Sequence, residues 1–210
     1  MQNSFAEKLL QAEAVRLQPD NPFTWASGWH SPIYCDNRRL LSFPDIRTFV
    51  KDGIAALVHT HFPEANVVAG VATGAIAIGA LVADTLGLPF VYVRPKPKDH
   101  GMGNQIEGRL PDGARVAVVE DLISTGGSSL KAVEALRKAG AQIEGMAASF
   151  TYGFPVAEAA FREADVNLVT LSDYPHVLNA ALTRGYITAE QQAILAVWRE
   201  NPAEWGRVIH

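Results

Sequence analysis

The stretch VAVVEDLISTGGSSLKAVEAL, from Val116 to Leu136, changes character twice along its length. A run of apolar and β-branched residues ends at two adjacent acids, Glu120 and Asp121. Small residues and hydroxyls follow at 124–129, and an amphipathic pattern then predicts a helix. A buried strand, a short bend and a helix in this order are typical of a parallel sheet, because a helix carries the chain back to the start of the next strand.

The same alternation continues on both sides of this stretch. Strands are expected at 66–72, 88–94, 114–120, 142–152 and 166–172, with helices at 73–87 and 128–140. Gly87 and Gly140 stand where these two helices should end. Because the strand patterns are continuously apolar, helices should cover both faces of the sheet. The sequence therefore predicts an α/β fold with a parallel sheet flanked by helices.

Both ends of the chain carry further helical patterns. These helices are expected at 4–16, at 44–61 and twice within 176–200. Ser4 and Glu7 have the spacing of a capping box, Pro44 suits the first position of a helix, and Thr188 would cap the last one. Residues 18–44 are rich in Pro, Gly, Ser and aromatic residues, which predicts loops and short strands.

The composition is that of an ordinary globular chain, with 210 residues, 48% of them apolar and 19% charged. This length predicts a single domain over 1–210. The net charge of −4 argues against nucleic-acid and anionic-membrane surfaces, which need basic excess. Cys35 is the only cysteine, which excludes an internal disulfide and suits the cytoplasm. The apolar stretch 67–88 is interrupted by glycines and Asp84, so no membrane span is expected.

The bend after the two acids has the properties of a phosphate-binding loop. Gly126 and Gly127 allow a close approach of the backbone, and the helix start that follows favours an anion. In an open parallel sheet, ligands bind beyond the carboxyl ends of the strands, where Glu120 and Asp121 lie. Carboxylates suit this place if they face ribose hydroxyls or the shell of a Mg²⁺ ion, which predicts a sugar phosphate as ligand. The alternative is that both acids only cap the loop.

Two common nucleotide-binding motifs do not fit. No Gly-Lys-Ser or Gly-Lys-Thr follows a glycine run, which excludes a Walker loop. GMGNQIEG at 101–108 has Ile106 in place of the third glycine and is not part of a strand-to-helix turn, which excludes a dinucleotide fingerprint.

Three motifs carry a resemblance to a known family. Two acids that close a strand, followed by LISTGGSS at 122–129, resemble the phosphoribosyl-diphosphate (PRPP) signature of the type I phosphoribosyltransferases. YVRPKPKDHGMGNQIEGRL at 92–110 and FTWASGWHSPIYCDNR at 23–38 are similar to orotate phosphoribosyltransferases in particular. The C-terminal segment from 171 also resembles many bacterial members. The resemblance covers nearly the whole chain and implies formation of orotidine 5'-monophosphate in pyrimidine biosynthesis.

The resemblance also implies a set of site residues and a small N-terminal hood, formed by 1–43, over the base. The PRPP contacts would come from Arg94, Lys98, His100, Glu120, Asp121, Leu122, Ile123, Ser124, Thr125, Gly126, Gly127 and Ser128. Lys98, His100 and Asp121 would be catalytic, with either Lys98 or His100 protonating the leaving diphosphate. Ser124 would also contact orotate. Mg²⁺ would be held mainly through PRPP, without direct protein ligands.

The polar segment 95–109 corresponds to a lid that the family shares across a homodimer interface. The chain departs from some members at Ala26, where they carry a lysine, and in ASFTYGFP at 148–155, where an arginine that holds the orotate carboxylate has no counterpart. Two alternatives remain open. A purine phosphoribosyltransferase would share the PRPP loop, and a PRPP-sensing regulator would bind PRPP without turnover.

Overall fold

A computed structural model of the chain describes residues 1–25, 28–96 and 105–205. Its central sheet consists of β5 (Val67–Val71), β6 (Phe90–Val93), β7 (Ile106–Glu107), β8 (Arg115–Ile123), β9 (Gln142–Thr151) and β10 (Leu168–Asp173). The strands lie in the order β10-β9-β8-β5-β6-β7. All neighbours pair in parallel except β6 and β7, which pair antiparallel. The five predicted parallel strands are confirmed, and β7 adds an antiparallel edge.

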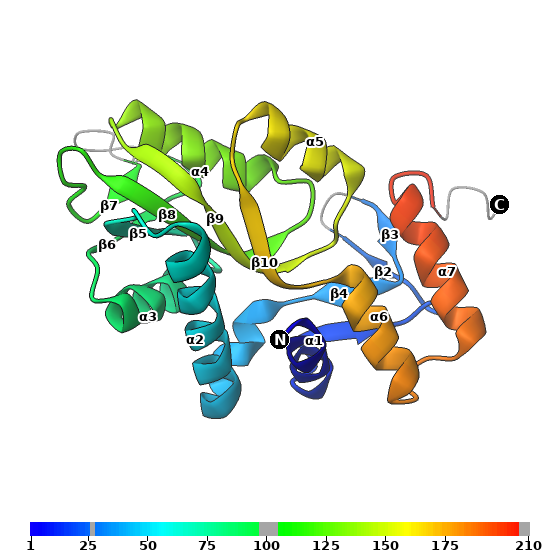
Figure 1. Cartoon of the computed structure of the whole chain (residues 1–210). Coiled ribbons are helices and arrows are strands. Elements are labelled where there is room, and N and C mark those ends of the chain that lie inside the picture. The colour runs from blue at the N-terminus through cyan, green and yellow to red at the C-terminus, as the bar shows by residue number, and fades with distance from the viewer. Residues whose placement is uncertain (26–27, 97–104, 206–210) are drawn as a thin grey trace.

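Helices cover both faces of this sheet, as Figure 1 shows. They are α1 (Gln2–Gln11), α2 (Pro44–His61), α3 (Ile76–Leu86), α4 (Gly127–Lys138), α5 (Pro155–Glu163), α6 (Tyr174–Thr183) and α7 (Ala189–Glu200), with a short 3-10 helix η1 (Asn37–Ser42). α4 and α5 lie on one face of the sheet, and α2 and α3 lie on the other, where α1 and α6 continue the layer. The predicted flanking of the sheet is therefore confirmed.

Strand β8 illustrates why these strands are apolar throughout. Val116 and Val118 point into the core shared with α4 and α5, whereas Ala117 and Val119 point into the core on the opposite face. All four side chains are fully buried. Because successive side chains of a strand alternate between its two faces, a strand covered on both faces is apolar at every one of these positions.

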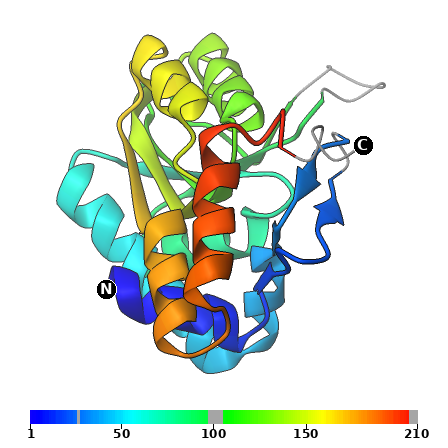
Figure 2. The ribbon, with the colours of Figure 1, turned by 90° about the vertical axis from the view of Figure 1, so that its right-hand side faces the viewer.

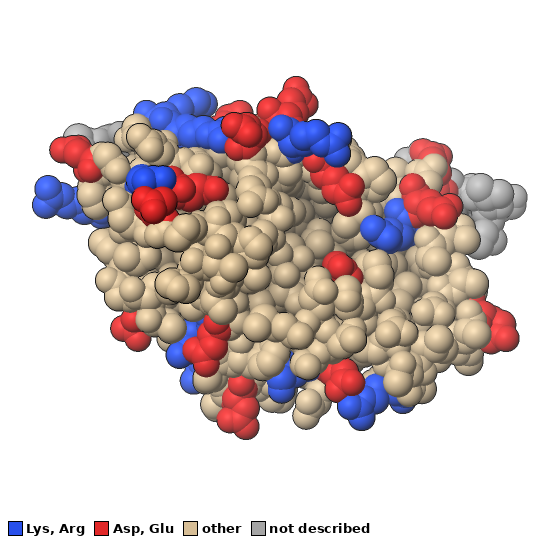
Figure 3. Space-filling view, viewed as in Figure 1, with Lys and Arg blue, Asp and Glu red and all other residues tan. Residues whose placement is uncertain are grey.

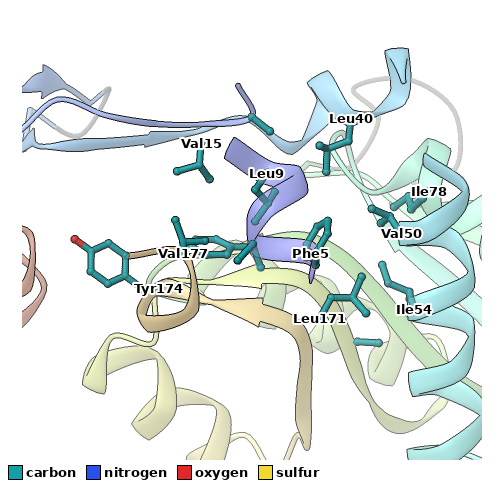
Figure 4. Close-up of a cluster of buried hydrophobic side chains, with 14 of the residues drawn as sticks. Phe5, Leu9, Val15, Leu40, Val50, Ile54, Ile78, Leu171, Tyr174 and Val177 are labelled. Carbon is teal, nitrogen blue, oxygen red and sulfur yellow. The ribbon is translucent and has the colours of Figure 1, made fainter. Parts of the chain in front are cut away.

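Helix α1 packs against α6 and β10, and its side chains also reach α2, as the close-up in Figure 4 shows. Its side chains Phe5 and Leu9 lie in one cluster with Ile54 of α2, Leu171 of β10 and Val177 of α6. These side chains are almost completely buried, and burial of each contributes roughly 1.5–3 kcal/mol to stability. The N-terminal helix is thus an integral part of the core that supports the sheet.

The segment between α1 and η1 forms two small antiparallel sheets outside the central one. They consist of β1 (Val15–Leu17) with β4 (Ile33–Cys35), and of β2 (Phe23–Thr24) with β3 (His30–Ser31). Figure 2 shows these strands on the same side of the molecule as α7. Trp198 of α7 is fully buried, its Nε1 donates a 3.2 Å hydrogen bond to the carbonyl of His30, and its ring contacts Trp25. The C-terminal helix therefore anchors this segment.

The first helix is shorter than the predicted span of 4–16. α1 ends at Gln11, and 15–17 form strand β1 instead. Glu13 adopts a left-handed conformation, with φ of 51°, which turns the chain, and Val15 then pairs with Cys35. Pairing between distant segments overrides the local helical pattern here.

The predicted capping box at Ser4 and Glu7 is also wrong. The helix is preceded by Met1, and no side chain caps it. Glu7 Oε2 instead accepts a 2.7 Å hydrogen bond from Arg184, near the other end of the chain.

Two further predictions about helix ends agree with the structure. The helix predicted at 44–61 has these limits, and Thr188 caps α7 in a capping box with Gln191. The polar segment 95–109 contains the short strand β7, which the sequence analysis did not predict, because two residues are too short a pattern to indicate a strand. Residues 97–104 of this segment lie outside the described residues.

Charged side chains of both signs are mixed along the rim formed by α4 and α5 on the face shown in Figure 3. The centre of the same face is mostly uncharged. Within the described residues, no helix combines the length and the apolar character needed to cross a membrane.

Candidate active site

The two acids at the end of β8 are neighbours in the chain and contact different elements. Glu120 lies on the side of α4 and is only 4% exposed. Its Oε2 accepts a 2.7 Å hydrogen bond from the hydroxyl of Ser129, and its Oε1 accepts a 3.0 Å bond from the backbone N–H of Asp121. Both oxygens of the Glu120 carboxyl group are therefore engaged by the protein.

The environment of the two acids disfavours their charged forms. Burial raises the pKa of Glu120 well above its ordinary value, and the neighbouring charge of Asp121 raises it further. Burial also raises the pKa of Asp121, although its hydrogen bond with Glu120 and the charge of Arg38 act in the opposite direction. Such shifted carboxyl groups at the end of a strand are typical of sites that bind ligands.

Asp121 faces the turn between β5 and α3. Its carboxylate lies so close to Gly74 that a Cβ atom at this glycine would overlap with it. Its backbone carbonyl accepts a 2.5 Å hydrogen bond from Nδ2 of Asn37, at the start of η1. In the same turn, the peptide bond between Ala72 and Thr73 is cis. The site thus brings together the end of β8, the turn after β5 and the segment that follows the N-terminal strands.

The predicted phosphate-binding loop forms a bend at 124–126, and α4 begins directly after it. Gly126 has φ of 82°, and a Cβ atom there would lie 2.8 Å from the ring of Phe161, so both the backbone and the packing require glycine. In the described part of the chain no side chain caps α4, and its first turn contains no acid. Its first N–H groups are therefore free for an anion, with the exposed hydroxyls of Thr125 and Ser128 beside them.

The other predicted site residues after the acids differ in their accessibility. Leu122 and Ser124 are half-buried, whereas the side chain of Ile123 is fully buried in the core. The carbonyl of Ile123 accepts a 3.0 Å hydrogen bond from the backbone of Tyr152. The side chain of Ile123 is therefore structural in this conformation. Lys98 and His100 lie outside the described residues.

Arg94 follows β6 and lies near the phosphate-binding loop. Its backbone N–H donates to the carbonyl of Gln105, and Nε2 of Gln105 donates to the carbonyl of Arg94, both at 2.9 Å. Arg94 lines a cavity of about 310 Å³ together with Gln105, Ser128 and Lys131. The pairing that starts β7 thus holds an arginine beside the first turns of α4.

Two residues at this site, Asn37 and Lys131, were not predicted from the sequence, and Ser129, one of the hydroxyls of the bend, contacts Glu120, a contact that was not predicted either. Asn37 gave no local signal, because its contact with Asp121 bridges segments far apart in the chain. The contact of Ser129 with Glu120 could have been anticipated, because Ser129 lies in the first turn of the helix that follows the two acids. Lys131 follows Ser128 by three residues, a spacing that places both on one side of a helix.

The segment after β9, where the sequence lacks an arginine, is reached by an arginine from another element. Arg199 of α7 donates hydrogen bonds to the carbonyls of Tyr152 and Gly153, at 3.0 and 2.8 Å.

Burial raises the pKa of the Cys35 thiol well above its ordinary value, and its Sγ lies 3.4 Å from Oδ1 of Asn37. Cys35 is thus a packed thiol.

The side chains of the site also indicate how a metal ion could be held there. Among the described residues, no three or more His, Cys, Asp or Glu side chains gather in a way that could hold a metal. Because Glu120 is engaged by Ser129 and a backbone N–H, Asp121 is the acid of the pair with more access to a ligand. This arrangement fits an ion that arrives with a phosphorylated ligand and receives most of its oxygen ligands from it.

Comparison with known proteins agrees with this fold and identifies the family. A family model described as phosphoribosyl transferase domain matches residues 45–172, which defines the chain as a phosphoribosyltransferase. Orotate phosphoribosyltransferase from Bacteroides fragilis is 62% identical over 98% of this chain and 97% of its own length. The enzyme of the same name from Listeria innocua serovar 6a is 52% identical over 99% of both chains. This chain belongs to the orotate phosphoribosyltransferase family.

A solved structure supports the same assignment. The crystal structure of orotate phosphoribosyltransferase from Aeropyrum pernix matches with a TM-score of 0.75 and 31% sequence identity. The match covers 88% of this chain and 99% of that one.

Proposed function

We propose that this protein transfers the 5-phosphoribosyl group from PRPP to orotate, forming orotidine 5'-monophosphate and diphosphate in the synthesis of UMP. The observation that carries this proposal is the uncapped start of α4, directly after an acid pair at the end of β8, in a chain of this family. The 5-phosphate lies against the N–H groups of 125–128, and the ribose hydroxyls meet Asp121.

In the reaction, the bond between C1 of the ribose and the diphosphate oxygen breaks, and its electron pair leaves with the diphosphate. N1 of orotate attacks C1 directly and forms the new bond, and the proton of N1 passes to the departing diphosphate, so no covalent intermediate with the protein is needed. Asp121 orients the ribose and stabilises the positive charge that develops on it. When bound, Mg²⁺ supplies charge neutralisation to the diphosphate oxygens.

The protein contributes cations to the same leaving group. Arg94, Lys98 and His100 neutralise the diphosphate, with Lys98 as the larger contributor. One cation at 4 Å contributes about 4 kcal/mol at an effective dielectric constant of 20, and the contribution grows when water leaves the site. We assign the exclusion of water to the segment 95–109, acting as a lid shared across a homodimer.

The base binds near Ser124, beneath an N-terminal hood to which residues 1–43 contribute through the strands β1–β4. The contact between Asn37 and Asp121 supports this placement, since it joins the end of the hood segment to the strand that carries the acids. The whole chain then acts as one phosphoribosyltransferase domain, working in the cytoplasm.

The test is a steady-state assay with Mg²⁺ and PRPP that follows the absorbance of orotate, with hypoxanthine, adenine and uracil in parallel. Turnover of orotate alone is expected. Turnover of a purine without orotate would overturn the proposal in favour of a purine enzyme. Binding of PRPP without turnover of any base would favour a regulator.

A further inference from the structure

One lysine near the phosphate-binding loop has no role in the function proposed above. The cavity of about 310 Å³ that Arg94 lines opens between the ends of β5 and β6 and the first turns of α4. Its polar and backbone lining comes from Ala72, Arg94, Gln105, Gly127, Ser128 and Lys131. Lys131 is exposed and lies in the second turn of α4.

The cavity is cationic. Among the described residues that line it, Arg94 and Lys131 are basic and none is acidic. Arg94 Nη1 is buried without a hydrogen bond to any described residue, and it lies 3.7 Å from Oε1 of Glu107. In the described part of the chain, the side chain of Lys131 makes no hydrogen bond or ion pair, whereas Lys138 of the same helix is paired with Glu134. Glu107 does not line the cavity and offsets part of the charge of Arg94, so that the cavity keeps a positive excess, which is complementary to an anion.

The position of Lys131 in helix α4 also favours the binding of an anion. The first turns of a helix favour negative charge because its N–H groups point outward there. α4 has no acid in its first turn, and Lys131 follows one turn later on the side of Ser128. An anion bound between Lys131 and Arg94 accepts charge-assisted hydrogen bonds from both cations.

We propose that Lys131 is a binding residue for the diphosphate group of PRPP, acting from the helix side of the cavity opposite Arg94. This inference rests on the proposed function. The 5-phosphate occupies the N–H groups of 125–128, whereas the cavity extends from this loop toward Ala72 and Arg94, at the ends of the neighbouring strands. The diphosphate is the part of the substrate that reaches them.

The forward and reverse reactions distinguish a contact of Lys131 with the diphosphate from a contact with the 5-phosphate. PRPP and free diphosphate carry the group that Lys131 contacts, whereas orotidine 5'-monophosphate carries only the 5-phosphate. Loss of a diphosphate contact therefore weakens the first two ligands and leaves the third unchanged. Loss of a 5-phosphate contact weakens PRPP and orotidine 5'-monophosphate alike.

The experiment compares Lys131→Ala and Lys131→Arg with the wild type and with Lys138→Ala. Lys138 is a matched control, because it lies on the same helix and is exposed, with Glu134 as partner at 3.7 Å. In the Lys131→Ala variant, the KM for PRPP and for diphosphate should rise about tenfold, equivalent to about 1.4 kcal/mol. The KM for orotate and for orotidine 5'-monophosphate should stay within about twofold, and Lys131→Arg should retain most of the affinity.

Unchanged constants in Lys131→Ala would overturn the inference, as would an equal rise for PRPP and orotidine 5'-monophosphate. If the alanine variant does not fold, Lys131→Gln, which keeps the aliphatic stem, serves in its place. If the wild type does not turn over orotate, the proposed function fails separately. Calorimetric titration with Mg²⁺ and inorganic diphosphate then decides, and equal affinity in wild type and Lys131→Ala would overturn the role of Lys131.

Discussion

The hydroxyl of Ser129 donates a 2.7 Å hydrogen bond to Oε2 of Glu120, and both residues are buried. This bond joins the end of β8 to the first turn of α4 and closes the phosphate-binding loop into a ring. The loop between them is thus held in shape by a contact that does not depend on a ligand. Such preorganisation lowers the entropic cost of binding the sugar phosphate.

Substitution of Ser129 by alanine should therefore loosen the loop. Ser129→Ala leaves one oxygen of a buried carboxyl group without its donor, which should lower the free energy of unfolding by about 1–3 kcal/mol. The KM for PRPP should rise as well. Urea unfolding and initial rates measure the two effects. Thr85→Ala, which removes an exposed hydroxyl bonded to the carbonyl of Leu81, is the control, and equal stability of both variants would contradict the role of Ser129.

The raised pKa of Glu120 predicts a pH dependence of stability. Burial raises this pKa in the folded state above the ordinary 4.5, so the folded protein keeps a proton that the unfolded chain releases above this pH. The free energy of unfolding should thus decrease as the pH rises from about 4.5 toward the raised pKa. Asp121 contributes in the same direction, because burial also raises its pKa.

The Glu120→Gln variant lacks the contribution of Glu120 and keeps that of Asp121. The stability of this variant relative to the wild type should increase from about pH 5 to about pH 8. Urea unfolding at several pH values measures this difference. A difference that does not vary with pH would show that Glu120 titrates alike in the folded and unfolded states.

The close approach of Gly74 to Asp121 predicts a sensitive position outside the loop itself. A methyl group in the Gly74→Ala variant would displace the Asp121 carboxylate, so kcat/KM for PRPP should fall by about tenfold or more. Ala80→Ser, at an exposed position of α3, serves as control for the helix. Full activity of the Gly74→Ala variant would mean that the position of Asp121 does not matter for PRPP use.

Lys98 is expected to be the largest cationic contributor from the lid segment. If it acts as one electrostatic donor to the leaving group, Lys98→Ala should lower kcat about 100-fold. Lys96→Ala, which changes an exposed lysine of the same segment, should have a much smaller effect. A kcat of wild-type size in Lys98→Ala would place this lysine at the solvated surface.

The aromatic anchor of the hood segment is open to a stability test. Trp198 is fully buried and contacts Trp25, Tyr152 and Tyr174, so Trp198→Ala should lower the free energy of unfolding by about 3–5 kcal/mol. The less buried Trp205 gives the control, and Trp205→Ala should cost less. Because Trp198 also holds His30, a higher KM for orotate is expected. Equal effects of both substitutions on unfolding would contradict the anchoring role.

The parts of the fold that the sequence predicted are those set by local pattern. The strand around Val116–Val119 and the helix at 44–61 follow from continuous or periodic apolar residues. The prediction of a helix over 4–16 was wrong at its C-terminal end, because the turn at Glu13 and the pairing of Val15 with Cys35 depend on residues 20 positions away. Strand β7 was not predicted for the same reason, since its two residues form a strand by pairing with β6.

The candidate site follows the same division. The loop at 124–128 could be predicted, because glycines and hydroxyls before a helix have a local meaning. The engagement of Glu120 by Ser129 and the contact of Asn37 with Asp121 required the packing of separate elements. These contacts assign different roles to two acids that look equivalent in the sequence.

The most direct measurement is a crystal structure of the protein with PRPP and Mg²⁺. The 5-phosphate should lie against the N–H groups of 125–128, the ribose hydroxyls beside Asp121, and the diphosphate between Arg94 and Lys131. Density for PRPP elsewhere, for example in the groove of about 570 Å³ lined by Tyr174 and Arg199, with the loop at 124–128 empty, would contradict the account.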